Sequence, residues 1–126
     1  TEQKTKYKEE LPYVYLQCGF SSSSTISLVG CTTYNLSDSF IFLDEIKVLG
    51  GKIPFTNTVI KSGERISHSG VEGLIHPTKD TLQYLEIHFR TRGNKKYIAK
   101  QKLELKIGAD GKNRVTGLGE SWVEKK

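Results

Sequence analysis

This chain of 126 residues has little cysteine, no methionine and no long apolar run. No apolar stretch approaches the ~20 residues that a bilayer-spanning helix needs, so the sequence predicts no transmembrane segment. Because methionine is absent and the chain starts at Thr1, we expect a processed protein, either after signal-peptide removal or after truncation. The two cysteines are too few for a disulfide-dense scaffold, so the fold must rest mainly on packing.

The two cysteines, Cys18 and Cys31, lie on either side of the four serines at positions 21–24. They are equally distant from the bond between Ser24 and Thr25, as a β-hairpin requires of two residues that face each other. Directly opposed antiparallel residues bring their Cβ atoms to about 4.5–5.5 Å, close to disulfide range. We therefore expect a Cys18–Cys31 disulfide, and with it a secreted or periplasmic protein.

The composition indicates one folded domain. Charged residues make up 26% of the chain and aromatic residues 10%, which is too aromatic for a disordered protein. Residues 1–10 are polar and predict a lead-in, and residues 11–126 predict a single β domain. The net charge of +5 fits either a solvated surface or contact with an anionic surface.

Runs rich in aromatic and β-branched residues recur along the chain, separated by Gly, Ser, Asp and Asn, and indicate strands. We expect strands over residues 13–20, 25–31, 52–61, 71–76, 81–91, 96–107 and 114–123. Pro54 limits its strand to an edge or an end of a sheet. Together these strands predict an all-β fold, a single antiparallel β-sandwich or barrel-like domain of about seven or eight strands.

Residues 39–49 leave two structures open. Apolar side chains at positions 40, 43 and 46 fit a helix, whereas those at 40, 42, 46 and 48 fit a strand. A short helix would be capped by Ser37 or Asp38 and would end at Gly50. We favour the strand.

Residues 81–91 and 96–107 alternate apolar and polar residues over two long runs, which predicts a sheet with one wet face. Leu85, Ile87 and Phe89 would face the core. The candidate binding residues of the opposite face and its turn are Tyr84, His88, Arg90, Arg92, Lys96, Lys100 and Lys102. Lysines beside an aromatic ring suit contact with a polyanion, although lysines also protect exposed strands from aggregation.

Signatures of catalysis and metal binding are weak. No serine lies in a G-x-S-x-G elbow, and the adjacent Asp44 and Glu45 would point to opposite faces of a strand. His68, His76 and His88 lack the close pairing of zinc ligands, and we expect them to be exposed. The sequence therefore predicts no metal site, no cofactor and no catalytic residues.

Aromatic residues near the amino end of the chain suit either the core or a recognition surface, and we favour the core. They are Tyr13, Tyr15, Phe20, Phe40 and Phe42. Near the other end, Gly117 and Gly119 precede the sole tryptophan, Trp122, and predict a bulge or a close backbone approach next to a buried ring.

One short motif concerns modification. Asn35, Leu36 and Ser37 match the N-glycosylation sequon. Such triplets occur often by chance, and this one has meaning only for a secreted protein of a eukaryote.

These features favour a binding protein over an enzyme. We expect a secreted or periplasmic module that recognises a protein or glycan partner through a sheet face or loops, with an inhibitor or immunity-type protein as one concrete form. The alternatives are a polyanion-binding protein that uses the lysine-rich face of the C-terminal hairpin, and a hydrolase without a recognisable motif. The sequence disfavours nucleic acid as a partner, because it carries no aromatic pattern typical of RRM or OB folds.

Overall fold

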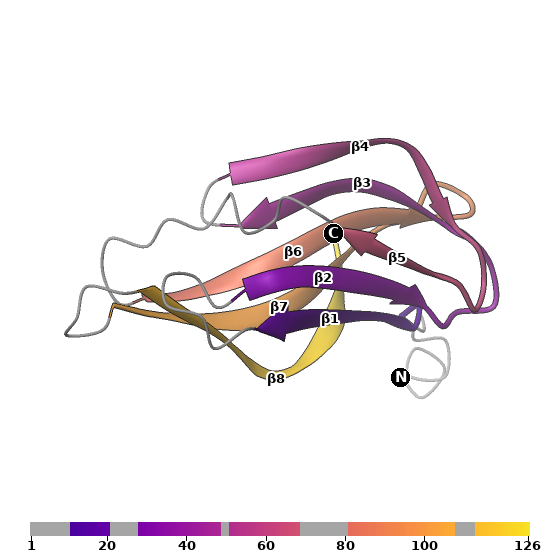
Figure 1. The fold of residues 1–126 in the computed structure, drawn as a ribbon. Helices are drawn as coiled ribbons and strands as arrows, with labels where there is room; N and C mark the ends of the chain where they lie inside the picture. The colour runs from indigo at the N-terminus through magenta and orange to yellow at the C-terminus, as the bar shows by residue number, and fades with distance from the viewer. Residues whose placement is uncertain (1–10, 21–27, 49–50, 69–80, 108–112) are drawn as a thin grey trace, which may run out of the picture.

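Two antiparallel sheets make up the computed structural model, which describes residues 11–20, 28–48, 51–68, 81–107 and 113–126 (Figure 1). The strands are β1 (Val14–Phe20), β2 (Leu28–Asn35), β3 (Ile41–Val48), β4 (Gly51–Ile60), β5 (Arg65–His68), β6 (Thr81–Thr91), β7 (Lys96–Ile107) and β8 (Asn113–Lys125). The shorter sheet has the order β1-β2-β5 and the longer sheet the order β4-β3-β6-β7-β8. The all-β sandwich predicted from the sequence is confirmed.

Several predicted elements agree closely with the strands, and the differences have simple causes. The ambiguous segment at positions 39–49 is the strand β3, and β2 continues beyond the cysteine to Asn35. The sequence does not predict β5, because it is four residues long and mostly polar. The strand predicted at 71–76 and the lead-in at 1–10 lie outside the described residues. Within the described ranges, no helix is long and apolar enough to cross a membrane.

The first hairpin contains the predicted disulfide. Cys18 and Cys31 are direct partners in the antiparallel ladder of β1 and β2, and their sulfur atoms are bonded. Cys31 is buried, and Cys18 packs against the core. The prediction that the two cysteines face each other in a hairpin is therefore confirmed, although the register shifts between Gly19 and Phe20.

The core lies between the two sheets and follows the alternation of the strands. In β6 the side chains of Leu85, Ile87 and Phe89 are fully buried, as the sequence predicts. The residues of β7 that share this inner face are Tyr97, Ala99, Gln101 and Leu103. In Figure 1, β1 and β2 lie in front of β7, and their inward side chains complete the core. Burial of this apolar surface is the main favourable term in the folding of the domain.

Two of the connections that cross between the sheets, from β2 to β3 and from β4 to β5, meet at the buried residue Asn35. Its Nδ2 donates to the carbonyl oxygens of Ser39 at 2.9 Å and Ile60 at 2.8 Å, and its Oδ1 accepts from the backbone N–H of Ser37. The backbone of Asn35 also accepts from Gly63 and donates to Glu64. These bonds make Asn35 a structural residue. Its side chain is fully buried, so an enzyme that glycosylates asparagine cannot reach it in the folded protein.

We expect Asn35→Ala to lower the free energy of unfolding by about 3 kcal/mol, because it removes the donor to the buried carbonyl of Ile60 and the acceptor for the N–H of Ser37. Urea titration followed by circular dichroism measures the loss. The matched control is Gln17→Ala, which removes an exposed amide and should change stability by less than about 0.5 kcal/mol. Equal effects of the two substitutions would contradict the structural role of Asn35.

Two of the three histidines are buried, which corrects the expectation that they are exposed. His68 in β5 is 7% exposed, and its Nε2 lies 2.6 Å from Thr33 Oγ1. The ring of Phe55 in β4 packs against it, with ring centroids 5.2 Å apart. His88 is 4% exposed, and His76 lies outside the described residues. Burial lowers the pKa of His68 to about 4, because a charged imidazole loses its hydration there.

The lowered pKa of His68 makes the free energy of unfolding depend on pH. The folded protein holds His68 neutral below its ordinary pKa of 6.5, so the unfolded chain binds more protons between pH 6.5 and 4. Stability from this residue is therefore present above pH 6.5 and is lost as the pH falls toward 4, by about 3 kcal/mol.

Urea unfolding of the native protein and of His68→Gln, at neutral pH and near pH 4.5, measures this contribution. The substituted protein should lose less stability on acidification than the native one. Identical losses would show that His68 contributes nothing to the acid sensitivity.

Candidate functional site

The face of the five-stranded sheet that points away from the core, here called the outer face, carries most of the candidate binding residues. Alternate positions of a strand share a face, and the register of β6 and β7 aligns their outward side chains. The residues that the structure brings to this face are Tyr84, His88, Arg90, Lys96, Lys100 and Lys102. Arg92 lies instead in the turn between the two strands, where Gly93 and Asn94 adopt positive φ.

Acidic side chains interleave with the cations of the outer face. Lys100 Nζ lies 3.0 Å from a carboxylate oxygen of Glu124, and Lys106 Nζ lies 3.3 Å from Glu104. The hydrogen bond between Lys100 and Glu124 raises the pKa of the lysine and, with a second bond from Trp122, lowers the pKa of the glutamate. Surface pairs of this kind add little stability, but they neutralise the field of the face. The outer face therefore carries both acidic and basic side chains, and is not purely basic.

Two exposed aromatic rings stand together on this face. Tyr84 is 44% and Trp122 37% exposed, and their ring centroids lie 5.9 Å apart at an interplanar angle of 90°. Lys100 Nζ lies 5.6 Å from the centroid of the Tyr84 ring. Trp122 Nε1 donates to Glu124 Oε2 at 3.0 Å. These four side chains, Tyr84, Lys100, Trp122 and Glu124, are called the aromatic platform below.

A bulge in β8 explains the position of Trp122. Lys100 pairs with Trp122, whereas Lys102 pairs with Leu118, so the register shifts between the two lysines. Gly119 takes a positive φ of 74° inside this bulge, a conformation that glycine adopts at no steric cost. The predicted bulge is confirmed, but the expected burial of the tryptophan is wrong. Residues that pair across a ladder share a face of the sheet. Pairing Trp122 with Lys100, which points outward, would therefore have predicted that the tryptophan side chain is exposed.

A second bulge opens the sheet between β3 and β4. Leu43 pairs with Thr58 and Glu45 with Pro54, so Asp44 alone stands opposite three residues of β4. Asn57 lies within this bulge at φ 49°, in the left-handed region that residues other than glycine rarely enter. Pro54 fits here because β4 is an edge strand, as the sequence predicts.

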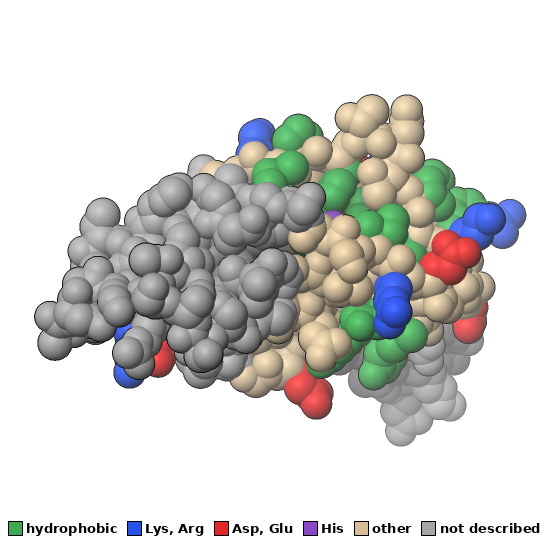
Figure 2. Space-filling model, viewed as in Figure 1, with side chains coloured by type: hydrophobic (Ala, Val, Ile, Leu, Met, Phe, Trp, Pro, Cys, Tyr) green, Lys and Arg blue, Asp and Glu red, His purple; other side chains and the backbone are tan. Residues whose placement is uncertain are grey.

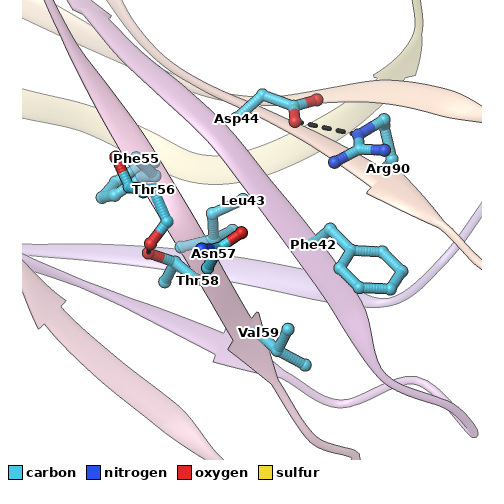
Figure 3. A pocket seen from close by; sticks show the side chains of 9 residues that line it. All are labelled: Phe42, Leu43, Asp44, Phe55, Thr56, Asn57, Thr58, Val59 and Arg90. Atoms are coloured by element: carbon cyan, nitrogen blue, oxygen red, sulfur yellow. Dashed lines mark hydrogen bonds and ion pairs between the residues drawn. The ribbon is translucent and has the colours of Figure 1, made fainter.

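This irregularity forms a pocket of about 460 Å³, called the bulge pocket below (Figure 3). Its polar lining comes from Asp44, Thr56, Asn57, Thr58 and Arg90, and its apolar lining includes Phe42. Figure 3 shows the β4 residues on one side of the pocket, across from the Asp44–Arg90 pair.

Arg90 is held in place by three neighbours. Its Nε donates to Asp44 Oδ1 at 2.9 Å, and its guanidinium carbon lies 5.3 Å from the centroid of the Phe42 ring. Its Nη1 also donates to Asn94 Oδ1 at 3.4 Å. The pocket thus presents a fixed guanidinium, a carboxylate, an amide and hydroxyl groups beside an aromatic ring. This set of groups can hydrogen-bond an uncharged ligand that is rich in hydroxyls.

The pairing of β3 with β6 corrects the expectation that Asp44 and Glu45 point to opposite faces, because Leu43 pairs with Phe89 and Glu45 with His88, which leaves Asp44 as an extra residue in β3. Asp44 bonds to Arg90, and Glu45 Oε1 lies 4.0 Å from His88 Nδ1. Arg90 and His88 project from the same face of β6, so both carboxylates reach the outer face. His88 Nε2 also contacts Glu86 at 2.8 Å. Among the described residues, no group of three or more histidine, cysteine or acidic side chains is arranged to hold a metal ion.

Several aromatic residues expected in the core are exposed. Tyr13 is 64% and Phe40 37% exposed, whereas Tyr15 and Phe42 are half-buried. On the outer side of the shorter sheet, the rings of Tyr15 and Tyr34 lie 6.0 Å apart, with the Arg65 guanidinium over Tyr34. Figure 2 shows mostly uncharged side chains on the described part of the viewed face. The side chain of Phe20 lies outside the part of the structure that is described.

Comparison of the chain with protein-family models, curated proteins and solved structures found no match. The class that the fold defines is an all-β sandwich with one disulfide. The chemistry of the aromatic platform and of the bulge pocket is therefore what indicates a function.

Proposed function

We propose that this protein is a secreted or periplasmic binding module, without catalytic activity, that recognises a glycan through the outer face of its five-stranded sheet. The observation that carries the proposal is the aromatic platform. A sugar ring presents an apolar C–H face that packs on an aromatic ring, while its hydroxyl groups bond to polar side chains at the ring's edge. Tyr84 and Trp122 supply the rings, and Lys100 and Glu124 supply polar groups beside them.

The contacts within the platform support binding by a preformed site. Trp122 is tied to Glu124, Glu124 to Lys100, and Lys100 lies over the ring of Tyr84. Each contact restricts the rotamers of two side chains before a ligand arrives. Side chains ordered in advance lose less entropy on binding, which raises affinity.

The charge pattern supports a neutral glycan over a polyanion. Lys100 and Arg90, two of the candidate cations, each share a hydrogen bond with a carboxylate. A polyanion would have to displace those carboxylates or lie against them, whereas an uncharged chain meets no such repulsion. Affinity for a neutral glycan should also depend little on salt, because few counterions are released on binding.

The chemistry of the bulge pocket supports binding over hydrolysis. Asp44 is the acidic residue among the described lining residues, and it is bonded to Arg90. Glycoside hydrolysis generally uses a pair of carboxyl groups, one protonated and one ionised. Glu45, the nearest acidic neighbour in sequence, lies instead beside His88.

The disulfide supports the proposed location. Cystines form and persist in oxidising compartments and are rare in the cytosol. The bond between Cys18 and Cys31 closes a loop with a sequence separation of 13, which adds roughly 3 kcal/mol of stability by the chain-entropy model.

A second candidate function is recognition of a protein partner through the shorter sheet. Its outer side carries Tyr15 and Tyr34 as a cross-strand pair, with Arg65 over the second ring. Tyrosine and arginine are the residues that most often anchor protein interfaces. The binding experiment below separates this surface from the platform.

If the protein works in an oxidising compartment, the cystine should be present in protein taken from its native source. After alkylation of free thiols during lysis, the intact protein should gain no alkyl group, and reduction should raise its mass by roughly 2 Da as two thiols form. Alkylation of both cysteines before reduction would contradict the proposed location.

Trp122→Ala should weaken binding of a neutral glycan by roughly 5- to 150-fold, taking as a guide the about 1–3 kcal/mol that a nucleobase gains by stacking on one aromatic side chain. A printed array of neutral and acidic glycans selects the probe, and isothermal titration calorimetry with that probe measures the affinity. The matched control is Tyr34→Ala, which removes an aromatic ring from the other sheet and should leave the affinity unchanged.

Two results would contradict the glycan proposal. A loss confined to Tyr34→Ala, measured with a captured protein partner, would favour the second candidate function. Selection of acidic glycans alone, with an affinity that falls steeply as salt rises, would favour the polyanion alternative.

A further inference from the structure

The geometry points to the bulge pocket as a second subsite for the same glycan, so that the ligand is a neutral, extended oligosaccharide lying along β6. This inference rests on the proposed function of the aromatic platform. It adds that one chain reaches from the platform to the pocket. It also sets a minimum length for the ligand.

The two sites lie on one face of one strand. Tyr84 of the platform and Arg90 of the pocket are six positions apart in β6 and therefore project from the same side of the sheet. Six residues of a strand span about 20 Å at about 3.3 Å per residue. A monosaccharide or disaccharide is too short to contact both sites, whereas a chain of several linked sugars covers the distance.

The outward side chains of β6 between the platform and the pocket project little from the sheet. His88 is buried, and Glu86 and its neighbour across the ladder, Ile98, are half-buried. The hydrogen bond from Glu86 to His88 holds the carboxylate close to the sheet. A chain that lies along β6 would thus pass over a floor of one apolar and two polar side chains, without an exposed ring or long lysine of β6 in its way.

The pocket offers what the reducing or non-reducing end of a sugar chain requires. Phe42 supplies an aromatic ring, Asp44 an acceptor, and Asn57 both a donor and an acceptor. The hydroxyl groups of Thr56 and Thr58 line the same side. The volume of about 460 Å³ falls within the range of pockets that hold small ligands.

The charges of the two sites and the straight path between them indicate which glycans could bind. Each site carries one ion pair, Lys100 with Glu124 at the platform and Arg90 with Asp44 at the pocket, so the cation within each site already holds a carboxylate in place of a sulfate or carboxylate of the ligand. A ligand that follows a strand must be straight. β-1,4-linked sugars form straight ribbons whose rings present C–H faces and hydroxyl edges alternately, whereas helical glucans curve away from a sheet.

The test is calorimetry with neutral β-1,4-linked di-, tetra- and hexasaccharides of the glucan, xylan and chitin types. For the native protein, affinity should rise at least about tenfold from the disaccharide to the hexasaccharide. The double variant Asn57→Gly with Thr56→Ala removes two exposed pocket side chains. Glycine adopts the positive φ of position 57 without strain, so the fold should be kept.

We expect the double variant to bind the disaccharide as the native protein does but to lose most of the gain from chain length. Trp122→Ala should weaken binding of every length, and Gln17→Ala on the other sheet should change none. An undiminished gain from chain length in the double variant would overturn the second subsite and leave the platform standing. Failure of all neutral glycans to bind the native protein would overturn the proposed function itself.

Discussion

The hydrogen bonds of one buried amide hold the two sheets in register with each other. The chain leaves the shorter sheet after β2 and returns to it before β5, and both passages bond to Asn35. The amide therefore fixes where β3 begins and where β4 ends. Because the bulge pocket lies between these two strands, its geometry depends on a residue that does not line it.

Much of the fold follows from local pattern. The alternation in β6 and β7 continues without a break, so the core residues Leu85, Ile87 and Phe89 could be assigned from the sequence. The cysteine pair gave the register of β1 and β2, since a disulfide needs opposed residues. β5 could not be found in this way, because four residues carry too little periodicity and are ordered by pairing with β2.

The candidate site was only half predictable, for a reason that lies in the two bulges. Strand alternation identifies the outward cations of β6 and β7, and it fails wherever an extra residue enters the ladder. The extra residue of β3 in its pairing with β6 brings Asp44 and Glu45 to one face, and the bulge in β8 sets Trp122 beside the lysines. The faces of Asp44, Glu45 and Trp122 cannot be assigned until the pairing of the strands is known, and that pairing depends on the tertiary structure.

One edge strand of each sheet, β1 and β4, is unsuited to pairing with a further strand. On β1 the N–H of Leu16 donates to the hydroxyl of Ser121 at 2.8 Å, so a side chain occupies a position where a neighbouring polypeptide would bond. On β4 the proline and the three-residue bulge interrupt the row of donors and acceptors. These two edges therefore resist edge-to-edge polymerisation with further copies of the chain.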